Sequence, residues 1–112
     1  MISFNGFLEN CLTFNVAAKI NAGVPVCLSS SETVKPCIAN DVIIGVVASG
    51  SDDAASVQMT GYVELPYTGQ TAPTVGYVAL KADGSGGVVV GGSRNYTVIK
   101  VDTVNKVCGF IL

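Results

Sequence analysis

The strongest constraint on the fold is a regular alternation of apolar and polar side chains over residues 57–65. Successive side chains of a β-strand point to opposite faces, so a period of two predicts a strand with one buried face. An extended chain would carry Val57, Met59, Val63 and Leu65 on the buried face, and Gln58, Thr60, Tyr62 and Glu64 on the wet face. The rest of the chain must supply the apolar surface that covers the buried face.

Shorter segments of the same kind occur along the chain, separated by turns rich in Gly, Asn, Asp and Ser. We predict further strands at residues 11–16, 24–28, 33–39, 42–48, 75–80, 88–90, 95–101 and 106–112. No segment has helical periodicity beyond a possible turn at residues 16–20. This pattern predicts an all-β fold, a small single-domain β-barrel or sandwich of about seven to nine short strands with an N-terminal arm.

Local features refine this prediction. The β-branched run at residues 42–48 predicts a central strand that is buried on both faces and forms a hairpin with residues 57–65. Gly45 within this run indicates a bulge or a close backbone approach. Pro25 belongs near the start of a strand or on an edge, because it donates no backbone hydrogen bond. The two glycines at residues 91–92 are expected to break the strand before them.

The chain has 112 residues, which fit one domain, and we divide it into an arm at residues 1–10 and a β-domain at residues 11–112. Only 12% of the residues are charged, against roughly 25% in typical soluble domains. The surface must therefore be poor in charge, so it is either rich in Ser, Thr, Asn and Gly or partly covered by another subunit. Formation of a homo-oligomer is the default expectation.

The arm carries Phe4, Phe7 and Leu8 around Gly6, without strand or helix periodicity. It either folds back over the core of its own domain or docks on a neighbour. Under the second interpretation Phe4, Phe7 and Leu8 are the residues that contact the partner. The arm has no basic start and no long apolar run, so we expect no secretory signal and a protein that stays in the cytoplasm.

The charge pattern argues against two classes of partner. The net charge is −2, and the six basic residues are scattered. Binding to nucleic acid needs several converging Lys and Arg, and binding to an anionic membrane surface needs a cationic amphipathic stretch. The longest strongly apolar run, residues 42–48, is far below the roughly 20 residues of a membrane span. We predict neither a nucleic-acid partner nor a membrane partner.

Cys11, Cys27, Cys37 and Cys108 contain no C-x-x-C pair, and the chain has no histidine. Zinc ligands usually occur in close pairs, often together with histidine. We therefore predict reduced thiols packed in the core, where Cys behaves as a small apolar residue. A disulfide or a four-thiolate metal site is the alternative. No metal site and no cofactor are predicted.

The absence of histidine also excludes Ser-His and Cys-His nucleophile pairs. Glu64 with Glu9 or Asp102 is the only loose option for a carboxylate pair, and Glu64 is expected on the wet face of a regular strand. The glycine-rich residues 84–87 lack the Lys and the following helix of a phosphate loop. We predict no catalytic residues and a protein that is not an enzyme.

Four stretches follow one another in a familiar order: AGVPV at residues 22–26, IGVV at 44–47, VQMTGYVELP at 57–66 and VGYVALKADG at 75–84. Over residues 11–112 this order resembles the small capsid decoration, or cement, proteins of tailed phages. The resemblance implies a β-barrel-like subunit, usually trimeric, that sits outside the phage head and braces neighbouring major capsid subunits. It brings no catalytic or cofactor-binding residues. The four cysteines and the aromatic arm depart from that family.

The resemblance therefore implies a structural virion protein on the capsid exterior, present in the host cytoplasm during assembly. Its implied partners are two further copies of itself and the major capsid protein. One alternative is a structural component of a phage tail or baseplate. Another is a small carbohydrate-binding module that uses Tyr62, Tyr67 or Tyr96 as a stacking surface.

Overall fold

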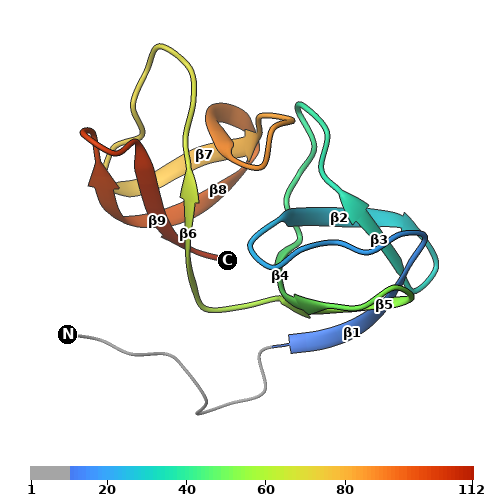
Figure 1. Cartoon of the computed structure of the whole chain (residues 1–112). Coiled ribbons are helices and arrows are strands. Elements are labelled where there is room, and N and C mark those ends of the chain that lie inside the picture. The colour runs from blue at the N-terminus through green and yellow to red at the C-terminus, as the bar shows by residue number, and fades with distance from the viewer. Residues whose placement is uncertain (1–10) are drawn as a thin grey trace.

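A computed structural model describes residues 11–112, and within this range the chain is all-β with no helix (Figure 1). Five strands form a closed barrel in the order β1-β3-β2-β4-β5: β1 Cys11–Val16, β2 Pro25–Ser30, β3 Thr33–Pro36, β4 Gly45–Gly50 and β5 Ala54–Gln58. Four strands form a sheet in the order β6-β9-β8-β7: β6 Tyr62–Pro66, β7 Gly76–Ala82, β8 Val88–Asp102 and β9 Val107–Ile111. The predicted all-β class is confirmed, and the possible helical turn at residues 16–20 is not formed.

The barrel is closed by β1, which pairs in parallel with β3 and antiparallel with β5. A closed sheet has no free edges. Its interior is filled by small aliphatic side chains, Val16, Ile20, Val26, Val34, Val47, Ala55 and Val57. The predicted hairpin of the fourth and fifth strands is confirmed, because β4 and β5 pair antiparallel.

The four-stranded sheet is antiparallel throughout and buries one face. Its core is larger than that of the barrel and contains the aromatic side chains Tyr67, Tyr96 and Phe110. Figure 1 shows the sheet beside the barrel, with β6 following directly from β5. Three residues of the barrel half, Cys37, Ile43 and Val46, belong to the sheet core.

The single strand predicted at residues 57–65 is wrong, because the structure divides this stretch between β5 of the barrel and β6 of the sheet. Gly61 has φ of +95°, a left-handed conformation that glycine adopts without steric cost, and the strand is interrupted there. The side chain of Gln58 spans the break and donates to the carbonyls of Thr60 at 2.9 Å and Tyr62 at 3.2 Å. The alternation survives, but Val57 enters the barrel core and Val63 enters the sheet core.

The central strand predicted at residues 42–48 is shifted. Strand β4 begins only at Gly45, and Val42 is exposed. Burial on both faces holds for Val46 and Val47. The close approach predicted at Gly45 is confirmed, because an added Cβ would lie 2.5 Å from Cγ1 of Val57.

The break predicted at residues 91–92 is also wrong. Both glycines have positive φ, 129° at Gly91 and 97° at Gly92, yet β8 continues through them. Ala79 pairs with Asn95 whereas Leu80 pairs with Val90, so the extra residues of β8 bulge out of the ladder. Pro25 is the first residue of β2, as predicted.

The segment between β3 and β4 joins the two halves. The Asn40 N–H donates to the Ala82 carbonyl at 2.9 Å, and the Ala82 N–H donates to the Asp41 carbonyl at 3.0 Å. The buried Ile43 carbonyl accepts from the Tyr96 hydroxyl at 2.8 Å and from the Arg94 guanidinium at 3.2 Å. This segment therefore holds the barrel against the sheet.

Candidate functional site

The outer face of the four-stranded sheet carries a row of side chains that crosses all four strands. Tyr77 of β7 pairs with Thr97 of β8, Thr97 pairs with Ile111 of β9, and Ile111 pairs with Tyr62 of β6. The alternate residues of the same strands, among them Tyr96, Val98, Phe110 and Val63, are buried on the opposite face. The row therefore points away from the core.

One end of this outer sheet face is apolar and exposed. Tyr77 is 74% exposed and Val75, immediately before β7, is 68% exposed. Ile99 of β8 is also exposed, although it follows the buried Val98. We use the name outer sheet face for Tyr62, Glu64, Val75, Tyr77, Thr97, Ile99, Lys100 and Ile111.

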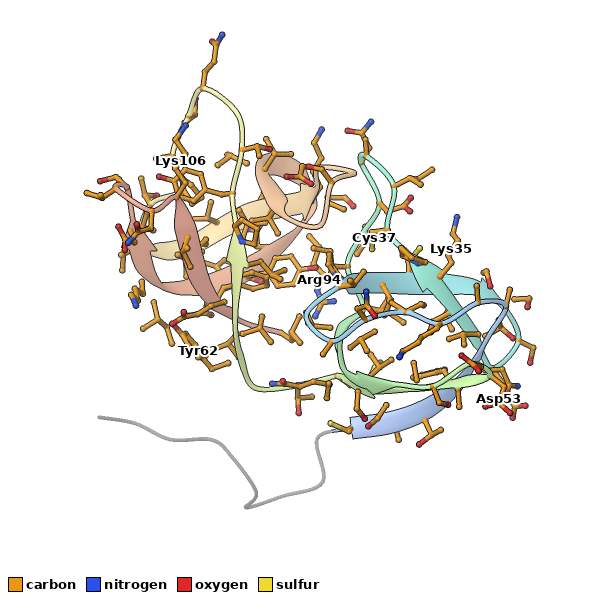
Figure 2. All side chains as sticks on the ribbon, viewed as in Figure 1. Lys35, Cys37, Asp53, Tyr62, Arg94 and Lys106 are labelled. Carbon is orange, nitrogen blue, oxygen red and sulfur yellow. The ribbon has the colours of Figure 1, made fainter. Side chains whose placement is uncertain are left out.

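The other end of the outer sheet face is polar. Lys100 and Glu64 form an ion pair at 3.6 Å across β9, where Gly109 has no side chain to separate them. The Tyr62 hydroxyl donates to Glu64 at 2.8 Å. Figure 2 shows Tyr62 on the sheet half of the molecule, away from the barrel. Burial, together with the neighbouring Glu64 carboxylate, raises the pKa of Tyr62 to about 12. Tyr62 is therefore neutral at physiological pH.

Of the three tyrosines considered from the sequence as a sugar-stacking surface, Tyr67 and Tyr96 are buried, whereas Tyr62 is half-buried. Tyr96 packs edge-on against Phe110 with ring centroids 5.1 Å apart, and the Arg94 guanidinium lies 4.7 Å from the Tyr96 ring. These two tyrosines are core residues.

The carboxylates considered for acid-base chemistry have structural partners. Glu64 is bound by Lys100 and Tyr62. The Asp102 carboxylate accepts hydrogen bonds from the backbone of Val104 and Asn105 in the β8–β9 turn. Glu9 lies outside the described residues. The described residues therefore do not present these groups as a free acid-base pair.

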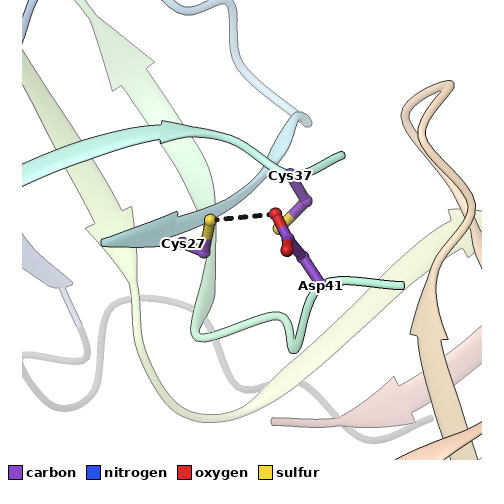
Figure 3. A group of neighbouring side chains, drawn as sticks. All are labelled: Cys27, Cys37 and Asp41. Carbon is purple, nitrogen blue, oxygen red and sulfur yellow. Dashed lines mark hydrogen bonds between the residues drawn. The ribbon is translucent and has the colours of Figure 1, made fainter. Parts of the chain in front are cut away.

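A second candidate site lies where the barrel meets the loop that joins it to the sheet. The Sγ atoms of Cys27 and Cys37 and a carboxylate oxygen of Asp41 all lie within 4.8 Å of one another (Figure 3). Cys27 comes from β2, Cys37 directly follows β3, and Asp41 comes from the loop after it. The Cys27 thiol donates to Asp41 Oδ2 at 3.3 Å, and the same oxygen accepts from the Ile38 N–H at 3.0 Å. We call these three residues the thiol–carboxylate cluster.

The protonation state of this cluster follows from its surroundings. Burial, reinforced by the adjacent Cys27, raises the pKa of Cys37 to about 12. Burial and the hydrogen bond to Asp41 also raise the pKa of Cys27. Hydrogen bonds from the Ile38 N–H and the Cys27 thiol lower the pKa of Asp41. At neutral pH the cluster therefore holds two thiols and one carboxylate.

Sequence pattern alone does not indicate this cluster, because Cys27 and Cys37 are ten positions apart. The antiparallel register of β2 and β3 brings them together: Cys27 pairs with Lys35, and Cys37 lies two residues further along the same face. All four cysteines are free thiols. Cys37 and Cys108 are buried as predicted, whereas Cys11 and Cys27 are only half-buried.

The predicted partner-contact residues Phe4, Phe7 and Leu8 lie outside the described residues. Among residues 11–112 no helix is long and apolar enough to span a membrane. Comparison of the chain with protein-family models gives no match, and comparison with curated proteins gives none either. The geometry of the outer sheet face and of the thiol–carboxylate cluster is thus the basis for functional inference.

Proposed function

We propose that this protein is a structural virion subunit that decorates and stabilises the outside of a tailed-phage capsid as a homotrimer. The observation that carries the proposal is the outer sheet face, whose exposed apolar side chains stand on a hydrogen-bonded antiparallel sheet. The resemblance between the order of the four sequence stretches and that of cement proteins supports the same role. The protein acts by surface contact and is not an enzyme.

The outer sheet face is suited to contacts between subunits. Apolar surface removed from water contributes about 25 cal/mol per Å², and an aromatic side chain offers the largest such area. Tyr77 and Val75 are mostly exposed in the single chain, so they have this area to bury. Their strand is fixed by its pairing with β8, so little backbone entropy is lost on docking.

We assign the outer sheet face to contacts between copies of this chain, and the arm residues Phe4, Phe7 and Leu8 to contacts with the capsid or a neighbouring subunit. The symmetric trimer presents several of these contacts at once, and their combined effect holds the protein on the capsid lattice by avidity.

The direct test mixes the purified protein with undecorated phage heads and measures co-sedimentation, with the mass of the free protein determined by light scattering. We expect a trimer that co-sediments with heads. A monomer that stays in the supernatant would overturn the proposal.

Two matched variants separate the role of the outer sheet face from a general effect of added charge. We expect Val75→Asp to shift the mass towards the monomer and to weaken co-sedimentation. Val104 is 88% exposed in the β8–β9 turn, away from the face. Val104→Asp should leave both measurements unchanged, and equal effects of the two variants would contradict the assigned face.

Removal of residues 1–9 tests the arm. If the arm serves contact with a partner, we expect the shortened protein to keep its far-ultraviolet spectrum and its melting temperature. Co-sedimentation with heads should be lost. Unchanged co-sedimentation would remove the arm from the mechanism while leaving the outer sheet face to be judged by its own variants.

A further inference from the structure

We propose that the thiol–carboxylate cluster is a zinc site, in which Cys27 Sγ, Cys37 Sγ and an Asp41 carboxylate oxygen bind one Zn²⁺ ion and a water molecule takes the fourth position. This site is independent of capsid binding. The sequence predicts no metal site, and only the folded chain brings the three groups together.

The distances suit a tetrahedral ion. Zn–S bonds of about 2.3 Å and Zn–O bonds of about 2.1 Å place two sulfur ligands roughly 3.8 Å apart and a sulfur and an oxygen ligand roughly 3.6 Å apart. In the cluster the Cys27 sulfur lies 3.3 Å from Asp41 Oδ2, and all three ligand atoms lie within 4.8 Å of one another. Side-chain rotations that move the ligand atoms by about 1 Å would complete the tetrahedral geometry.

The ligand set selects zinc among common divalent ions. Two thiolates favour Zn²⁺ over Mg²⁺ and Ca²⁺, which prefer oxygen ligands in larger number. A site with three protein ligands and one open position is also a familiar zinc arrangement. The candidate is thus a mixed sulfur and oxygen site that takes a borderline-soft cation.

The strand register favours an ion over a disulfide. Cys27 pairs with Lys35, so Cys37 is its diagonal neighbour and is not directly opposite. Diagonal neighbours on paired strands lie roughly 7–8 Å apart, whereas the Cα atoms of a disulfide lie about 4.4–6.8 Å apart. Two Zn–S bonds span the greater separation without movement of the strands.

Binding balances in charge and in protons. Zn²⁺ displaces one proton from each thiol, while Asp41 already carries its negative charge. The ion and three anionic ligands then sum to one negative charge, and the Lys35 ammonium, opposite Cys27 in the register, partly offsets it. Figure 2 shows Lys35 and Cys37 at the same end of the barrel. On the sheet side Tyr96 belongs to the same core as Cys37, and burial raises the pKa of its phenol, which stays neutral.

The location gives the ion a mechanical role. The three ligands come from β2, from the end of β3 and from the loop whose backbone hydrogen-bonds to Ala82 of β7. An ion bound there would connect strands β2 and β3 of the barrel to the loop that hydrogen-bonds to the sheet. Because a bound ion stabilises only the folded chain, zinc should raise the melting temperature.

The test uses the full chain, reduced and oxygen-free, titrated with Co²⁺ as a spectroscopic substitute for Zn²⁺. We expect one equivalent to give the thiolate-to-cobalt charge-transfer band and the visible bands of a tetrahedral site, and Zn²⁺ to abolish them. Cys27→Ser and Cys37→Ser should lose the charge-transfer band in part or entirely. Cys11→Ser, which changes a half-buried thiol on β1, should keep the whole signal.

Asp41→Asn keeps the test decisive if loss of the buried Cys37 impairs folding. The amide oxygen of Asn can still accept from the Ile38 N–H, so the loop is retained. The apparent affinity for Co²⁺ should fall about tenfold or more, since even outer partners of zinc ligands contribute 10–100-fold. In parallel, zinc should raise the melting temperature of the unmodified chain and of Cys11→Ser, but not that of Cys27→Ser.

Three results would overturn the proposal. The first is the absence of a charge-transfer band in the folded, reduced chain. The second is an unchanged band in Cys27→Ser. The third is a disulfide between Cys27 and Cys37 in the chain purified without reductant. It would show as a mass lower by two hydrogens and as a peptide that contains both cysteines. Capsid binding plays no part in these measurements, so the decoration role stands or falls separately.

Discussion

The barrel and the four-stranded sheet bury one face of their β-strands in different ways. The barrel closes on itself and fills a narrow interior with Val, Ala and Ile side chains. The sheet stays open at β6 and β7 and relies on Tyr67, Tyr96 and Phe110, together with residues supplied by the barrel half. The difference indicates that the barrel is self-sufficient, whereas the sheet depends on the barrel.

This dependence runs through the loop between β3 and β4. Cys37, Ile43 and Val46 complete the sheet core, and the Ile43 carbonyl is held by Tyr96 and Arg94. No residue of β6 to β9 belongs to the barrel core. A change in the sheet core should therefore affect the sheet first, and a change in the junction should affect the connection between the halves.

The largest expected effect is that of Phe110→Ala. Phe110 is fully buried in the sheet core, and removal of a buried Phe side chain costs roughly 3–5 kcal/mol. Urea unfolding followed by circular dichroism measures the loss. Val57→Ala, the matched change in the barrel core, removes less apolar area and should cost less. A larger cost at Val57 would reverse the comparison between the two cores.

Tyr96→Phe sharpens the role of the junction. The change removes the hydroxyl that donates to Ile43 and keeps the aromatic ring against Phe110. Because Arg94 still donates to the same carbonyl, we expect a loss of about 1 kcal/mol in the free energy of unfolding. Tyr77→Phe removes an exposed hydroxyl and serves as the control. Equal losses would show that the junction bond contributes nothing specific.

A pH titration tests the hairpin that joins β7 and β8. Burial alone would raise the pKa of Asp83, but hydrogen bonds from the Ser85 and Gly87 N–H groups and the Thr68 hydroxyl outweigh it and lower this pKa. Since the folded pKa lies below the unfolded value, the stabilisation is complete above pH 3.8 and is lost as the pH falls through the folded pKa.

Asp83→Asn should flatten this dependence. We expect a loss of about 1 kcal/mol or less at neutral pH, because Asp83 is partly exposed and solvent screens its charge. Melting temperatures measured from neutral pH to pH 2 compare the two proteins. A difference that grows as the pH falls would contradict the assignment, since the sign requires the difference to shrink.

The smallest expected effect is that of Lys100→Ala. The ion pair with Glu64 is exposed on the outer sheet face, and such pairs contribute about 0–1 kcal/mol. We expect a change of about 0.5 kcal/mol or less that disappears at high salt. A large loss that persists in high salt would mean that this end of the face is a structural part of the sheet.

Local pattern predicted the all-β class and some of the strands. The first strand lies at Cys11–Val16 as predicted. The antiparallel β4–β5 hairpin and the close backbone approach at Gly45 were also predicted from residues near one another in the sequence. Alternation at residues 57–65 correctly assigns faces, but it cannot distinguish one core from two. Both cores are lined by the same kinds of apolar side chain. The alternation of apolar and polar residues therefore continues unchanged across the division at Gly61.

Features that depend on register were missed for a physical reason. The thiol–carboxylate cluster exists only because β2 pairs with β3 in one of several possible alignments. Continuity of β8 through Gly91 and Gly92 likewise depends on a partner strand that accommodates the bulge. The outer sheet face could not be predicted without the strand order. Its row of side chains crosses β6 and β9, which are neighbours in the sheet although they are the first and the last of its four strands in the sequence.

The pairing of β6 with β9 sets an order of events during synthesis. Within the described chain β6 has no other strand partner, and β9 ends at Ile111. The barrel can close as soon as β5 has emerged, whereas the backbone groups of β6 stay unpaired until β9 is made. A chain released before β9 is made would thus carry a closed barrel and an unpaired β6, and such fragments should be the form of this protein most prone to aggregate.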